Sequence, residues 1–121
     1  MRSAAQAYGK VAKDAATPRE LEATLLLRAA ARLQTICDAW EGKSGELDDA
    51  LVFNRKLWSI FLTSVTREDN PLPREIRQNI ASLGVFVMNQ TVSLATDRRR
   101  ERVGSLISIN RELAAGLMSR A

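Results

Sequence analysis

The sequence predicts an all-α protein, a small antiparallel bundle of four to five helices, and three observations lead to that fold class. Apolar residues recur at steps of three and four along most of the chain. Residues that start and stop helices separate these apolar stripes. No long stretch alternates apolar and polar residues as a half-buried strand does. Because the intervening loops are short, successive helices are expected to be antiparallel neighbours.

The first well-marked helix is expected to start at Thr17-Pro18, where Thr17 can cap and Pro18 suits the first helical position, and to run to Gly42. A loop at 43–45 precedes the next stripe, which begins at Leu47 and is ended by the segment 67–73 with its two prolines. Further stripes cover 73–94 and 97–117. The segment 1–16 carries a short, weak stripe and is expected to form a marginal, frayed helix.

Details of two stripes refine this prediction. Val85 to Val87 would also suit a strand core, and Gly84 costs a helix about 1 kcal/mol relative to alanine, yet the helical stripe continues on both sides. Asp97 is expected to stabilise the positive end of the last helix. The centre of the core is expected to come from the two middle helices, through Leu51, Trp58, Phe61, Ile80, Leu83 and Val87.

Length and composition place the chain among ordinary soluble globular proteins. Its 121 residues fit one domain, 1–121, and apolar residues make up 45% of them. No apolar run approaches the roughly 18 residues that span a bilayer. No apolar signal segment follows the N-terminus, so a cytoplasmic protein is expected.

The residues needed for catalysis or metal binding are scarce. The chain has no histidine and a single cysteine, Cys37, which is expected to be a buried thiol. The acid pairs Glu20/Glu22 and Asp48/Asp49 lie in first helical turns, where the helix dipole explains them. We therefore expect no enzyme activity, no metal and no cofactor.

Four residues are candidates for binding a partner: Val52, Phe53, Asn54 and Asn110. Both asparagines lie on the apolar stripes of their helices, where an unbonded amide is costly. Either they form a buried polar pair that fixes helix register, or the seam is open and they offer polar contacts to a partner helix. An exposed Phe53 with Val52 would add an apolar patch.

The densest basic run supports an alternative function. Arg98, Arg99, Arg100 and Arg102 cluster near the start of the last helix, and the net charge of the chain is +4. Such a run can bind RNA phosphates, although it has no interleaved aromatic residue for base stacking. The alternative interpretation is a solvated helix start.

Several strings together resemble the FlaF family of alphaproteobacterial flagellar proteins. They are PRELE at 18–22, ALxxNRxLW at 50–58, NPLP at 70–73, QNI at 78–80, LGVFV at 83–87, INRE at 109–112 and GL at 116–117. Their order and spacing carry the resemblance from Tyr8 to Leu117.

The resemblance implies a role in flagellum biogenesis without catalysis. It implies a regulator that binds flagellin as a cytoplasmic export chaperone, supports flagellin synthesis and secretion, and acts alongside the regulator FlbT. It implies no particular binding residues. The alternative is a post-transcriptional regulator that binds flagellin mRNA through the basic run 98–102.

Overall fold

The computed structural model describes residues 18–119, and in that range it contains four long helices and no strand. These are α2 (Pro18–Asp38), α4 (Leu47–Val65), α5 (Arg74–Thr96) and α6 (Arg100–Ser119). A short helix, α3 (Trp40–Lys43), and one 3₁₀ turn at Ser44–Glu46 join α2 to α4. The predicted all-α fold is confirmed. The helix expected in 1–16 and the capping role expected of Thr17 lie outside the described residues.

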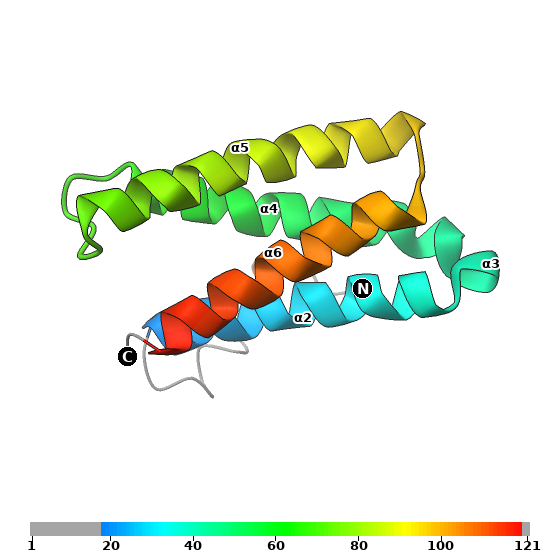
Figure 1. Ribbon diagram of the computed structural model, residues 1–121, viewed down its shortest axis with the longest axis horizontal. Helices are drawn as coiled ribbons and strands as arrows, with labels where there is room; N and C mark the ends of the chain where they lie inside the picture. The colour runs from blue at the N-terminus through cyan, green and yellow to red at the C-terminus, as the bar shows by residue number, and fades with distance from the viewer. Residues whose placement is uncertain (1–17, 120–121) are drawn as a thin grey trace.

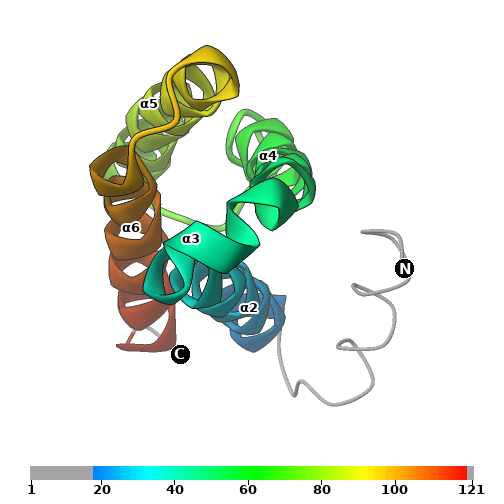
Figure 2. The same cartoon turned by 90° about the vertical axis from the view of Figure 1, so that its right-hand side faces the viewer.

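The four long helices run alternately up and down around a common axis (Figures 1 and 2). The most extensive packing joins α2 to α6, so the first and last of these helices close the bundle. Helix α5 packs mainly on α4 and has its smaller contact with α6. It forms one edge of the bundle, with a side that faces away from the other helices (Figure 2).

Two predicted helix ends need correction. The first stripe does not continue to Gly42, because α2 ends at Asp38 and the backbone of Ala39 leaves the helical region with φ −123° and ψ 44°. The chain resumes at once as α3, so the expected loop at 43–45 is helical instead. Asp97 ends α5 through its own N–H, which donates to the Ser93 carbonyl oxygen over 2.8 Å, and its carboxylate pairs with arginine side chains rather than with an amide of α6.

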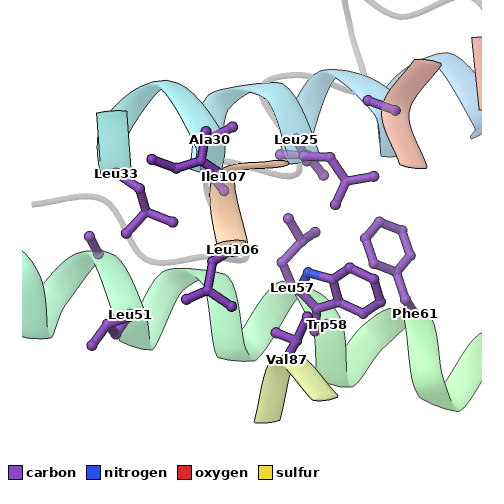
Figure 3. Packing of buried hydrophobic residues seen from close by; sticks show 14 of the residues in the cluster. Leu25, Ala30, Leu33, Leu51, Leu57, Trp58, Phe61, Val87, Leu106 and Ile107 are labelled. Carbon is purple, nitrogen blue, oxygen red and sulfur yellow. The ribbon is translucent and has the colours of Figure 1, made fainter. Parts of the chain in front are cut away.

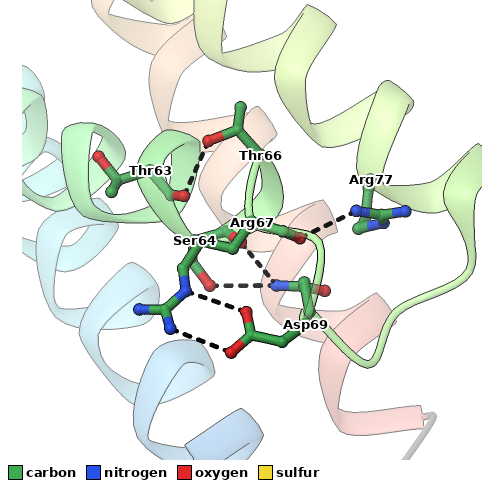
Figure 4. Close-up of polar contacts among 7 residues, drawn as sticks. Thr63, Ser64, Thr66, Arg67, Asp69 and Arg77 are labelled. Atoms are coloured by element: carbon green, nitrogen blue, oxygen red, sulfur yellow. Dashed lines mark hydrogen bonds and ion pairs between the residues drawn. The ribbon is translucent and has the colours of Figure 1, made fainter.

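The connection between α4 and α5 contains the two prolines that predicted it, and side chains hold it closed (Figure 4). Asn70 Nδ2 donates to the Ser64 carbonyl oxygen over 3.0 Å, and Asn70 Oδ1 accepts from the Leu72 N–H over 2.9 Å. Arg77 Nη1 donates to the Arg67 carbonyl oxygen over 3.1 Å. These bonds satisfy carbonyl groups that a helix end otherwise leaves free.

The core contains residues from all four helices (Figure 3). Of the six residues expected at its centre, five are buried and Leu83 is half-buried against it. The prediction that the centre of the core comes from the two middle helices is nevertheless wrong. Leucines of α2 and α6 are as fully enclosed as Trp58, because the closing contact between those helices lies along the same core. These fully enclosed leucines are Leu26, Leu33 and Leu106.

Two buried amides join α4 to α6 across the core. Trp58 Nε1 donates to Asn110 Oδ1 over 2.9 Å, and Asn110 Nδ2 donates to Asn54 Oδ1 over 2.7 Å. All three side chains are fully buried. The prediction that Asn54 and Asn110 offer contacts to a partner is therefore wrong for this structure. These bonds confirm the buried polar pair of the other interpretation, and its role in fixing helix register stays a prediction.

The two asparagines are not equivalent, which gives a first prediction. Asn110→Ala removes both bonds and leaves Trp58 Nε1 and Asn54 Oδ1 without partners. Asn54→Ala removes one bond and also deletes Asn54 Nδ2, which has no hydrogen-bond partner among residues 18–119. Because a buried polar group left unpaired costs about 1–3 kcal/mol, Asn110→Ala should lower the free energy of unfolding by about 1–2 kcal/mol more than Asn54→Ala does. Equal losses in urea denaturation would contradict the arrangement.

Gly84 is required by close packing between α4 and α5. A Cβ atom at this position would lie 2.8 Å from Leu62 Cγ, closer than van der Waals contact permits. The helical cost of a glycine is therefore offset by the approach of the two helices.

The contact predicts non-additive effects of substitution. Gly84→Ala should destabilise the protein despite a gain of about 1 kcal/mol in helix propensity, because Leu62 must change its χ1 rotamer or α4 must move. In a Leu62→Ala background the same change should be neutral or stabilising. Chemical denaturation of the two single variants and the double variant measures this coupling, expected at about 1 kcal/mol or more. Additive effects would exclude the clash.

Candidate interaction surface

The apolar patch expected on α4 is smaller than predicted. Val52 is 40% exposed, but Phe53 is half-buried and packs against the core. The neighbouring outer positions of α4 carry exposed charges of both signs, at Asp49, Arg55 and Lys56. Val52 is thus an isolated apolar residue on a charged surface, which is common and needs no partner to explain it.

The arginine run is largely engaged by acids. Arg98 Nη2 lies 2.5 Å from Oδ1 of Asp48, a residue in the first turn of α4. This ion pair links the α5–α6 connection to the start of α4. Arg99 and Arg102 share Asp97, at 3.1 Å and 3.6 Å from its Oδ2. These pairs are partly exposed and each contributes at most about 1 kcal/mol. They nevertheless offset the positive charge that would attract a phosphate backbone.

Arg100 faces a different surface, the groove between α2 and α6. That groove is also lined by Cys37, Glu101 and Arg111. Cys37 is 5% exposed, and burial raises the pKa of its thiol, opposed by the nearby charge of Arg100. The thiol therefore stays protonated at neutral pH and behaves as a small apolar side chain, as the sequence predicted.

A second cavity, of about 290 Å³, lies at the end of the bundle where α2 begins and α6 ends. Its walls are mainly apolar, with Phe61, Leu72 and Leu117 among them, and Glu22 and Arg19 lie at its edge. Burial raises the pKa of Glu22, and the charge of Arg19 lowers it. A single carboxylate in an apolar site has no second acid or base for catalysis beside it among the lining residues.

The described residues contain neither a cluster of metal ligands nor a membrane-spanning helix. Within residues 18–119 there is no group of three or more His, Cys, Asp and Glu side chains that could hold a metal ion. No helix in the same range is long and apolar enough to cross a membrane.

The outer side of α5 is the surface that sequence reasoning missed. From Gln78 to Thr96 no residue is charged, although 26% of the chain is. Along this run Val85, Phe86 and Val92 are 58%, 45% and 69% exposed. Charge depletion together with exposed apolar side chains is typical of the centre of a protein interface. The uncharged run was visible in the sequence, but the sequence alone does not show that Val85 and Val92 are exposed.

The fold and this surface define a helical protein whose most distinctive surface feature is the uncharged, partly apolar outer side of α5. The family model for the flagellar protein FlaF matches residues 4–117. The chain therefore belongs to the FlaF family, and it is a flagellar protein. No curated protein and no solved structure matches the chain.

The ion pairs of the arginine run generate a third prediction. Changing Arg98, Arg99, Arg100 and Arg102 together to alanine should leave the protein folded, with an unfolding free energy within about 1 kcal/mol of the wild type. The lost pairs are partly compensated because four positive charges leave the N-terminal end of α6. Urea denaturation followed by circular dichroism measures the change.

The same variant tests the RNA alternative. We expect the wild type and the variant to behave alike when titrated into single-stranded RNA at 50 and 200 mM salt, followed by fluorescence anisotropy. A wild-type affinity that falls steeply with salt and disappears in the variant would instead support RNA binding through this run.

Proposed function

We propose that this protein is a non-enzymatic, cytoplasmic flagellin-binding protein that acts as an export chaperone and so supports flagellin synthesis and secretion. Membership in the FlaF family supports the flagellar context. The observation that supports binding is the uncharged, partly apolar outer face of α5, which no other described helix covers. FlbT is the second partner in this proposal.

The physical basis of the proposal is temporary protection of an apolar surface. Flagellin subunits assemble through apolar faces of helical terminal segments, and such faces are prone to associate before export. A bundle that exposes an uncharged helix face can cover one of them, because packing apolar surfaces together removes both from water. The interaction must also be reversible, since the subunit has to be released at the export apparatus.

The proposal predicts direct binding to monomeric flagellin. Isothermal titration calorimetry of the full chain with monomeric flagellin, at several temperatures, should show a negative heat-capacity change, because apolar surface is buried. The arginine variant described above serves as the control and should bind flagellin as the wild type does. No binding at high micromolar concentrations would contradict the proposed function.

A further inference from the structure

Helix α5 has two apolar seams: one is buried in the core, and the other lies beside it and is partly exposed. The inward seam includes Ile80, Val87 and Leu94, which are buried and seven residues apart. The outer seam consists of Ala81, Val85, Met88, Val92 and Ala95. Its steps of four, three, four and three residues are the heptad spacing of a coiled coil.

The outer seam is only partly covered by the bundle. Val85 and Val92 are 58% and 69% exposed and Ala95 is exposed, whereas Ala81 and Met88 are half-buried where α5 approaches the bundle. Core packing therefore does not account for the two valines. Leucine or valine at isolated surface positions is ordinary, but two exposed valines in heptad register within the uncharged run 78–96 are not.

The chemistry of the seam defines its occupant. A straight stripe with a period of 3.5 residues packs best against a second helix laid almost parallel to it, with its side chains in the spaces between those of α5. The positions flanking the seam on its open side are Ser82, Asn89 and Thr96, which are short and uncharged. The small side chains allow close approach, and the absence of flanking charges favours a helix whose own contacting stripe is apolar and uncharged.

The size of the seam argues against a stable dimer of this chain formed through the seam. The stretch from Ala81 to Ala95 is about 21 Å long at 1.5 Å per residue, and a helix is about 10 Å across. One face of that length offers roughly 200 Å², whereas a stable dimer buries about 800 Å² on each partner. A small contact of this kind favours reversible binding, as a carrier that releases its cargo requires.

From these observations we propose that the outer seam of α5 is the docking site for one amphipathic helix of the partner, whose contacting stripe is apolar and uncharged. The inference rests on the proposed function in taking flagellin as the protein that supplies this helix. It goes beyond that function in assigning the surface, the helical form of the bound segment and a contact that depends little on salt.

The test is a pair of matched substitutions measured by calorimetry with monomeric flagellin. Val85→Lys with Val92→Lys places two charges in the seam and should weaken binding about tenfold or more, because a charge buried in an apolar contact is costly. Val52→Lys makes the same exchange at an exposed valine on α4 and should leave the dissociation constant within about twofold. Wild-type affinity should be nearly constant between 50 and 500 mM salt.

Circular dichroism and thermal unfolding establish that each variant is folded. Lysine is a better helix former than valine, so exposed positions should tolerate the exchange. If the double variant does not fold, Val92→Lys alone replaces it, since Val92 is the more exposed of the two.

The outcomes separate the two proposals. Wild-type binding that persists in the α5 variant, or that is lost in Val52→Lys instead, overturns the docking site and leaves flagellin binding intact. No wild-type binding overturns both proposals. Concentration-dependent dimers of the wild type, seen by sedimentation equilibrium and absent in the α5 variant, would show that a second copy occupies the seam and would overturn the assigned occupant.

Discussion

The hydrogen-bonded chain from Trp58 through Asn110 to Asn54 is the interaction on which the arrangement of the bundle most depends. Apolar packing by itself tolerates a helix sliding along its neighbour, because one leucine can replace another in the same space. Two amides and an indole N–H must meet at specific positions or lose their bonds inside the core. They therefore fix α6 against α4, and α6 in turn closes the bundle onto α2.

This arrangement leaves α5 in a different position from the other long helices. It packs mainly on α4, with Gly84 lying against Leu62, and its contact with α6 is limited. Its inward seam completes the core, while Val85 and Val92 of its outer seam remain exposed. A helix held firmly on one side and left uncovered on the other is suited to receive a partner helix without rearrangement of the core.

The charged residues are concentrated away from the uncovered side of α5. Arg98 pairs with an acid of α4, and Arg99 and Arg102 pair with Asp97 at the end of α5. The uncharged run of α5 stops just before them. The ion pairs of residues 18–119 thus lie near the ends of the helices, and the exposed apolar residues of α5 lie along the side of the bundle. The two surfaces would respond differently to salt, because screening weakens exposed ion pairs and leaves apolar contacts almost unchanged.

The sequence by itself determined the helical class, most of the helix positions and most of the core. These features depend on local signals, such as Pro18 at a helix start, the prolines at 71 and 73, and the spacing of apolar residues. Local signals were least informative at helix ends. Nothing in the composition around Ala39 marks the break after α2, and Asp97 resembles a capping residue although its carboxylate binds Arg99 and Arg102 instead.

The tertiary structure decided whether polar and apolar residues of the stripes face inward or outward. Asn54 and Asn110 lie 56 positions apart, and periodicity places both on an apolar stripe whether that stripe is buried or open. Val85 and Val92 satisfy the helical period as well as core residues do, yet they face away from the bundle. The physical reason is that periodicity defines the sides of one helix, whereas burial depends on which neighbours cover each side, and those neighbours come from distant parts of the chain.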